Sequence, residues 1–274
     1  MAEELRGWNW HQAPLSPAYR AKLGVFEVAG QYCGNGRDVY VRHVLKKRGV
    51  ATAAMVEGRV LHDVVARIIL EAKGLMYREG HGCVGLLDKL SFPCEAWTEL
   101  GALPELKEKA ESLWHFERRR IVTRAEEVLA RQPHIGVDAL VTLTLPVVVE
   151  QKLNGTFLGL SSHLAADALG WAEPLMVDLK FGEPREFHRL ATTGYALVME
   201  SLYEYPISLG CVIYPNYREG RWTVERDFHI INDELRQWFI ESRDERMRLV
   251  EEEIDLGTET CQEQCLFWKI CRGG

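Results

Sequence analysis

The chain has 274 residues and a formal net charge of −7, and 47% of its residues are hydrophobic. This composition is typical of a packed globular protein with one large domain or two small ones. The negative charge argues against a protein that passively coats nucleic acid, because such proteins are basic. No run approaches the roughly 18 apolar residues of a membrane span, so we expect no membrane association.

The N-terminus and the cysteine content indicate the compartment. Met1 to Leu5 are acidic and lack an apolar core, which argues against a secretory signal. Seven cysteines without an export signal favour bound metal in a reducing environment over a disulfide scaffold. We therefore predict a cytoplasmic protein.

The first half of the chain is predicted to be helical. Apolar periodicity predicts helices over 15–48 (broken around 30–36), 55–74 and 103–132. Gly74 is expected to end the second of these helices. Residues 75–101 are predicted to be irregular, because glycines and a proline interrupt them.

After residue 135 the pattern changes to short segments rich in Val, Leu and Thr, separated by turn residues. The predicted strands span 140–153, 156–160, 163–169, 174–181, 207–214 and 222–230. Helices are predicted over 185–203 and 232–254. A few antiparallel strands, then a helix, then further strands predict an α/β (α+β) fold with a mixed sheet flanked by helices.

Two acidic residues and a lysine lie in neighbouring predicted strands. Asp167 lies within 163–169, and Asp178 and Lys180 lie within 174–181. Burying a charge in an apolar strand is costly unless the charge is paired, bound to a cation or at a strand end. Residues two apart on a strand face the same side, so Asp178 can hold a cation beside Lys180 while Asp167 reaches it from the next strand. Such a site suits Mg²⁺ or Mn²⁺ and phosphodiester hydrolysis, although the D-x-K spacing alone also fits an exposed ion pair.

His62 is a further candidate ligand, in the helix predicted over 55–74. This helix can aim the imidazole at a cation across the sheet, and Gly58 on the same helical face would allow another segment to approach closely. Taken alone, a histidine in a helix is more often a hydrogen-bonded structural residue.

The C-terminal cysteines form the densest motif in the chain. The motif is C-x3-C-x5-C and comprises Cys261, Cys265 and Cys271. Cys33 is a distant fourth candidate near the N-terminus, and Cys83 or Cys94 is an alternative to it. Four thiolates suit zinc or an iron–sulfur cluster, and the spacing does not decide between the two.

The order of these motifs resembles that of the CRISPR-associated RecB-like iron–sulfur exonucleases (the Cas-four family, archaeal branch), in the PD-(D/E)xK nuclease superfamily. The shared order is a cysteine, G-x3-H, Asp, (D/E)-x-K, a helix with a Tyr, and three cysteines. In this chain these are Cys33, Gly58 with His62, Asp167, Asp178 with Lys180, Tyr195, and Cys261, Cys265 and Cys271. Each motif is weak alone, but their order over most of the chain is fairly specific.

The resemblance implies a restriction-endonuclease-like core with a mixed sheet flanked by helices. It implies a helical region over 1–135 that contributes Cys33 and His62, a nuclease core over 136–231, and a C-terminal helix and cysteine segment over 232–274, in one integrated domain.

The resemblance also implies the site and the activity. His62, Asp167, Asp178 and the Leu179 carbonyl would bind Mg²⁺ or Mn²⁺, and Lys180 would be catalytic. The four cysteines would hold an iron–sulfur cluster, 4Fe-4S rather than 2Fe-2S. The implied function is exonucleolytic cleavage of DNA, mainly single-stranded, in CRISPR spacer acquisition beside the integrase proteins.

Two departures from the family's pattern keep other functions open. The glutamine expected four residues before Tyr195 is Ala191 here, so His188 or Arg189 is a candidate to contact DNA or a neighbouring group instead. The C-x3-C spacing is one residue longer than the C-x2-C common among relatives. The alternatives are a non-catalytic DNA-binding or scaffolding subunit of the CRISPR integration complex and a zinc-stapled helical DNA-binding module.

Overall fold

The computed structural model describes residues 2–101, 103–170, 174–258, 261 and 265–272. Its helices are α1 (Val25–Ala29), α2 (Arg37–His43), α3 (Ala53–Glu79), α4 (Val84–Leu87), α5 (Pro104–Arg131), α6 (Val137–Thr144), α7 (Arg189–Tyr203), α8 (Asp233–Glu251) and α9 (Trp268–Arg272). Its strands are β1 (Val147–Leu153), β2 (Leu164–Gly170), β3 (Leu175–Leu179), β4 (Leu209–Arg218) and β5 (Arg221–Ile230). None of the described helices is long and apolar enough to traverse a lipid bilayer.

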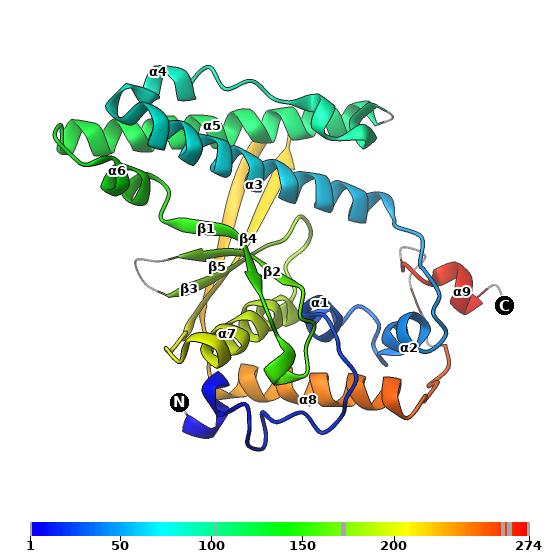
Figure 1. Cartoon of the computed structure of the whole chain (residues 1–274). Coiled ribbons are helices and arrows are strands. Elements are labelled where there is room, and N and C mark those ends of the chain that lie inside the picture. The colour runs from blue at the N-terminus through cyan, green and yellow to red at the C-terminus, as the bar shows by residue number, and fades with distance from the viewer. Residues whose placement is uncertain (1, 102, 171–173, 259–260, 262–264, 273–274) are drawn as a thin grey trace.

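The strands form one mixed sheet in the order β1-β2-β3-β4-β5. Neighbouring strands are antiparallel except β3 and β4, which pair in parallel. A parallel pair needs a crossover connection, and α7 supplies it. Helices lie above and below the sheet (Figure 1), so the predicted mixed sheet flanked by helices is confirmed.

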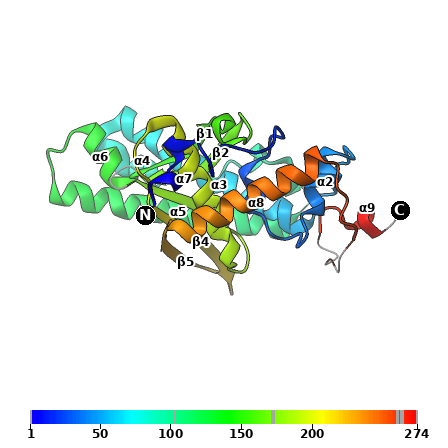
Figure 2. The same ribbon diagram turned by 90° about the horizontal axis from the view of Figure 1, so that it is seen from below.

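The helices α7 and α8 cover one side of the sheet. α7 packs on β3 and β4, and α8 packs on α7. Their apolar side chains, together with those of the sheet and the N-terminal segment, form one core. A Cβ at Gly194 of α7 would lie 2.4 Å from the Phe239 ring of α8, so glycine permits this close packing. Viewed from below, α8 extends from the N-terminus to α2 and α9 (Figure 2).

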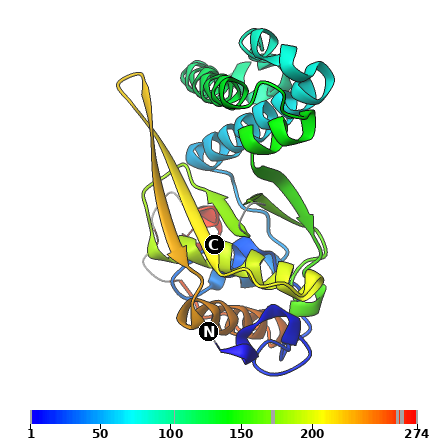
Figure 3. The same ribbon diagram turned by 90° about the vertical axis from the view of Figure 1, so that its left-hand side faces the viewer.

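A second apolar core lies between the long helices α3 and α5, with α4 and α6 packed beside them. Trp114 of α5 is fully buried there. The β4–β5 hairpin extends to this helical layer (Figure 3), where Trp222 enters the same core and donates a 3.2 Å hydrogen bond from Nε1 to Ser112 Oγ. The hairpin therefore fixes the helical layer, including the helix of His62, relative to the sheet.

Gly74 does not end its helix, contrary to the prediction. α3 continues to Glu79, because Leu75 and Met76 beyond the glycine are buried in the helical core. Their burial outweighs the cost of a glycine within a helix, which is about 1 kcal/mol. The helix ends at Gly80, whose φ of +55° is disfavoured for other residues. Short helices follow where an irregular segment is predicted.

Two predicted strand segments are also wrong. Residues 140–144 belong to α6, because Leu140 and Val141 are buried in the helical core. A short apolar run does not by itself distinguish a buried helix from a strand. Residues 156–158 form a 3₁₀ turn that ends at Gly159 with a φ of +71°. The remaining predicted strands and the helices predicted over 55–74, 103–132, 185–203 and 232–254 are present, with shifted ends. The segment 15–48 is helical only in α1 and α2, so its prediction is wrong over 15–24 and 44–48.

Candidate functional site

β3 places Asp178 in the middle of the sheet. β2 and β4 flank this strand, and Asp178 is only 4% exposed. Lys180, just after the strand, donates a 3.0 Å hydrogen bond from Nζ to Asp178 Oδ1, and the same nitrogen lies 2.8 Å from Oδ2. The D-x-K motif therefore forms an ion pair whose carboxylate is buried.

Asp167 reaches the end of β3 from the adjacent strand β2. The Leu179 amide donates a 2.8 Å hydrogen bond to Asp167 Oδ2, and this oxygen lies 3.5 Å from His62 Nδ1. α3 therefore aims the imidazole at an acid of the sheet. The prediction that Gly58 allows another segment to approach closely is wrong, because a Cβ at this position would meet no atom within 4 Å.

The two carboxylates repel each other. Burial and the charge of Asp178 raise the pKa of Asp167 to about 6, against the opposing effects of His62, the Leu179 amide and Lys180. Burial by itself would lower the pKa of Lys180, but Asp178 and Asp167 outweigh this effect and the net shift is upward. Lys180 is therefore an ammonium at neutral pH, and a cation bound by both acids would relieve their repulsion.

Asp167→Asn is expected to stabilise the metal-free protein at neutral pH. The folded-state pKa of Asp167 lies above its ordinary value of 3.8, so the carboxylate costs stability that grows between pH 3.8 and about 6 and persists above that range. The cost is at most about 3 kcal/mol. Urea unfolding in EDTA should show a gain for the variant at neutral pH that disappears near the lower end of this range. An equal gain at both pH values would contradict the assignment.

The donor set suits a hard divalent cation. Asp167 and Asp178 offer carboxylate oxygens, Leu179 a backbone carbonyl and His62 an imidazole, ligand types that Mg²⁺ or Mn²⁺ accepts. Within the described residues, no three His, Cys, Asp or Glu side chains form a closed set of ligands. Asp178 is instead held by Lys180, and its buried Oδ2 accepts no hydrogen bond from a described residue. Apart from the Lys180 ammonium 2.8 Å away, this oxygen has no partner among the described residues, so it can also face a cation and the residues fit the metal.

Tyr195 and Arg189, both of α7, lie in different surroundings. Burial, followed by the charges of Asp167 and Asp178, raises the pKa of the Tyr195 hydroxyl. Arg189 forms a two-pronged ion pair with Asp227 of β5, at 2.7 and 2.8 Å. The guanidinium of Arg189 is therefore engaged with the sheet.

His188 lies between two tyrosine hydroxyls and is only 3% exposed. Its Nε2 lies 2.8 Å from the Tyr32 hydroxyl, and its Nδ1 lies 3.1 Å from the Tyr214 hydroxyl. Burial and the charge of Lys180 lower the pKa of His188 to about 4, so the ring is neutral at physiological pH. Neither tyrosine is predicted from the sequence. Only the position of Tyr32 directly before Cys33 could have drawn attention to it.

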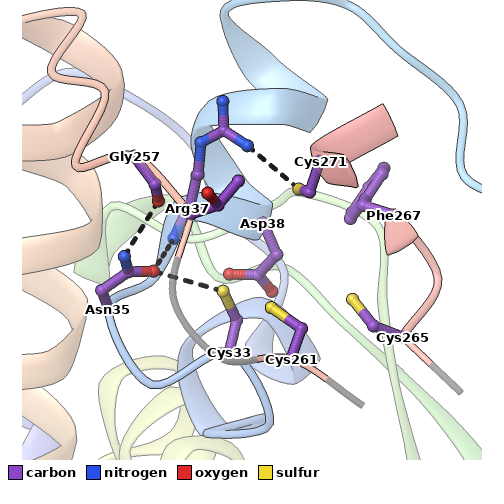
Figure 4. A pocket seen from close by; sticks show the side chains of 10 residues that line it. Cys33, Asn35, Arg37, Asp38, Gly257, Cys261, Cys265, Phe267 and Cys271 are labelled. Carbon is purple, nitrogen blue, oxygen red and sulfur yellow. Dashed lines mark hydrogen bonds between the residues drawn. The ribbon is translucent and has the colours of Figure 1, made fainter. Parts of the chain in front are cut away.

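The four predicted cysteines line one pocket between the loop that precedes α2 and the C-terminal segment (Figure 4). They are Cys33, Cys261, Cys265 and Cys271. Burial raises the pKa of the Cys33 and Cys265 thiols. Arg37 donates a 3.0 Å hydrogen bond from Nη1 to Cys271 Sγ and also pairs with Asp255. A cationic donor of this kind stabilises a thiolate, the form that binds metal.

The alternative fourth cysteines lie elsewhere. Cys83 is buried in the core of the helical layer, and Cys94 is partly exposed in a short 3₁₀ helix that follows α4. Neither residue lines the pocket of the C-terminal cysteines. Cys33 is therefore the cysteine that lies with the three C-terminal cysteines.

Comparisons with known proteins extend over nearly the whole chain. A family model described as "CRISPR-associated exonuclease Csa1" matches residues 1–274. A protein of that name from Saccharolobus solfataricus is 30% identical over 276 aligned positions, which cover 98% of this chain and 91% of that protein. Another of the same name, from Thermoproteus tenax, is 29% identical over 273 positions, which cover 99% and 92%.

Proposed function

The chain belongs to the CRISPR-associated exonuclease Csa1 family, and from this premise we propose that it cleaves DNA by metal-dependent hydrolysis of phosphodiester bonds. The family name supports a nuclease that acts on DNA within CRISPR systems. Beyond this, the proposal is digestion from an end, mainly of single strands, during spacer acquisition, with the integrase proteins as partners.

One observation carries the catalytic part of the proposal. Contacts link His62 to Asp167, Asp167 to Leu179, and Lys180 to Asp178, although the helix of His62 is far in sequence from the two consecutive strands that carry the acids. A surface ion pair does not require a helix to deliver an imidazole beside it. The buried Asp178 and the raised pKa of Asp167 are also features of functional sites rather than of solvated sheet faces.

We assign metal binding to His62, Asp167, Asp178 and the Leu179 carbonyl. A bound Mg²⁺ or Mn²⁺ lowers the pKa of water and neutralises charge on the scissile phosphate. Lys180, held against Asp178, presents an ammonium that orients the attacking water and attracts the phosphate. Because its side chain is 30% exposed, it can touch a substrate while it keeps its partner.

Removal of divalent cations is expected to abolish cleavage. The protein, purified anaerobically, is incubated with end-labelled single-stranded DNA in EDTA and then with excess Mn²⁺ or Mg²⁺. We expect cleavage only after the cation is added, and resistance of circular single strands, because an exonuclease needs an end. Cleavage at the same rate in EDTA would contradict the metal assignment.

We propose that Cys33, Cys261, Cys265 and Cys271 hold an iron–sulfur cluster, 4Fe-4S rather than 2Fe-2S. The thiols come from both ends of the chain, so a cluster would join the loop before α2 to the C-terminal segment. Its role would be structural, because it would clamp these segments beside α8. Zinc is the alternative that the thiol set also accepts.

Cys271→Ser is expected to remove most of the bound iron. Serine is a poor ligand for iron and zinc, and Arg37 would lose its sulfur partner. Cys94→Ser is the matched control, because Cys94 is also partly exposed but lies outside the pocket. Iron and sulfide analysis, with the visible spectrum, measures the difference. Bound zinc without iron in the parent protein would contradict the cluster, and equal iron in both variants would contradict the ligand assignment.

A specific observation keeps a second function in view. Ala191 is buried on α7, one turn before Tyr195, where the pattern of the Cas-four family that the sequence resembles has a glutamine. The second candidate is a non-catalytic DNA-binding or scaffolding subunit of the integration complex. Tight binding of DNA without cleavage under Mg²⁺ or Mn²⁺ would favour it.

A further inference from the structure

Tyr32 is a large aromatic residue that is exposed and yet held in place. It lies in the loop between α1 and α2, and it is 73% exposed. Its hydroxyl lies 2.8 Å from Nε2 of the buried His188, and its ring meets that of Phe187 edge-on, with centroids 4.9 Å apart. The tip and one edge of the ring are thus anchored, while most of its surface faces solvent.

The ring lies beside the proposed catalytic residues. Its partner His188 also lies 3.1 Å through Nδ1 from the hydroxyl of Tyr214, and the neighbouring Ile213 of β4 pairs with Leu179 and accepts a 2.9 Å hydrogen bond from the Lys180 amide. The His188 amide in turn donates a 3.1 Å hydrogen bond to the carbonyl oxygen of Arg185. Arg185 is exposed, and Lys180 is partly exposed. Two cations beside an exposed aromatic ring match the two features of a nucleotide, a phosphate and a flat base.

We propose that Tyr32 is a stacking platform for one base of single-stranded DNA, next to the phosphate that is cleaved. The proposal rests on the proposed function, because it places the substrate at that same site. Base stacking on aromatic residues tolerates any sequence, which suits a nuclease that degrades DNA from an end. In a duplex each base is already stacked within its own strand, so the platform favours single strands. The anchor on His188 and Phe187 reduces the entropy lost on binding.

The test measures binding without cleavage. The full-length protein, with its native cofactor content, is titrated without added divalent cation against single-stranded oligonucleotides that carry one 2-aminopurine, whose fluorescence falls on stacking. Tyr32→Leu is expected to weaken binding roughly ten- to a hundredfold and to remove the quenching. Tyr32→Phe keeps the ring, and its dissociation constant should lie within about threefold of that of the parent.

Tyr77 provides the matched control. It is 54% exposed, and its hydroxyl bonds to Asp138, but it lies on α3 and packs toward α6 instead of the site. Tyr77→Leu should therefore leave binding and quenching unchanged. The parent should also be titrated with oligonucleotides that each lack one base. We expect one position where the missing base weakens binding by the parent, and in Tyr32→Leu the same missing base should have no effect on affinity.

The outcomes separate this inference from the proposed function. If Tyr32→Leu binds like the parent, or if no single missing base weakens binding by the parent, the platform is wrong and the proposed nuclease function is unaffected. A parent protein that binds no single-stranded DNA overturns both. If Tyr32→Leu does not fold, the scan of missing bases on the parent still decides the question, because it requires no variant.

Discussion

Lys180→Ala is expected to lower the rate of DNA cleavage by roughly a thousandfold, the scale lost when one catalytic group is removed. The ammonium pairs with the buried Asp178 at 2.8 Å and is partly open to a substrate. Its loss removes the charge that we propose attracts the phosphate and orients water. It also leaves the Asp178 carboxylate buried without its cationic partner. The effect should therefore appear mainly in kcat.

The sheet provides a matched control. Lys152 pairs with Glu150, two residues before it on β1, at 3.2 Å. Like Asp178 and Lys180, these are an acid and a lysine two residues apart in the sheet. The side chain of Lys152 is 75% exposed, so Lys152→Ala should leave cleavage unchanged. Rates are measured with saturating Mn²⁺, and circular dichroism confirms folding. If Lys180→Ala cleaves DNA within threefold of the parent, the catalytic assignment fails.

Asp178→Asn separates the metal from the lysine. This variant lacks one of the two proposed carboxylate ligands, so Mn²⁺ binding as well as cleavage should be lost. Lys180→Ala keeps both acids and should retain measurable Mn²⁺ binding. The pair of variants thus distinguishes a failure of ligation from a failure of chemistry.

Arg236→Ala is expected to lower the free energy of unfolding by about 3–5 kcal/mol, the usual cost of breaking a buried ion pair. Arg236 of α8 and Glu200 of α7 are both fully buried, and two hydrogen bonds of 2.8 and 2.9 Å join them. The guanidinium also donates to the carbonyl oxygens of Leu5, Ile207 and Ile231. Its removal would leave a buried carboxylate with less compensation and several carbonyl groups without a donor.

Arg248 on the same helix is the matched control for this prediction. Among the described residues it forms ion pairs with Glu245 of α8 and with Glu252 directly after the helix, both at the surface, so Arg248→Ala should change stability little. Urea unfolding followed by tryptophan fluorescence compares the two variants with the parent. Equal unfolding midpoints for Arg236→Ala and Arg248→Ala would show that the buried network does not support the core.

The sequence predicts the elements whose signals are long and local. The charged helix before residue 132 and the strands that carry Asp167 and Asp178 follow from periodicity, because side-chain spacing alone determines which residues can share a buried face. Gly74 and the run over 140–144 are mispredicted for a different reason. There, contacts with a distant helix outweigh a weak local preference, and no local pattern contains that information.

The chain by itself determined its family and the identity of its candidate ligands, because the order of cysteines, histidine and acids is a property of the covalent chain. Only the tertiary structure decided which of these groups lie together: His62 beside Asp167, the terminal cysteines around Cys33, and Tyr32 against His188. Distances between remote segments depend on how helices and sheet pack, and packing is a sum of many small contacts spread over the whole molecule.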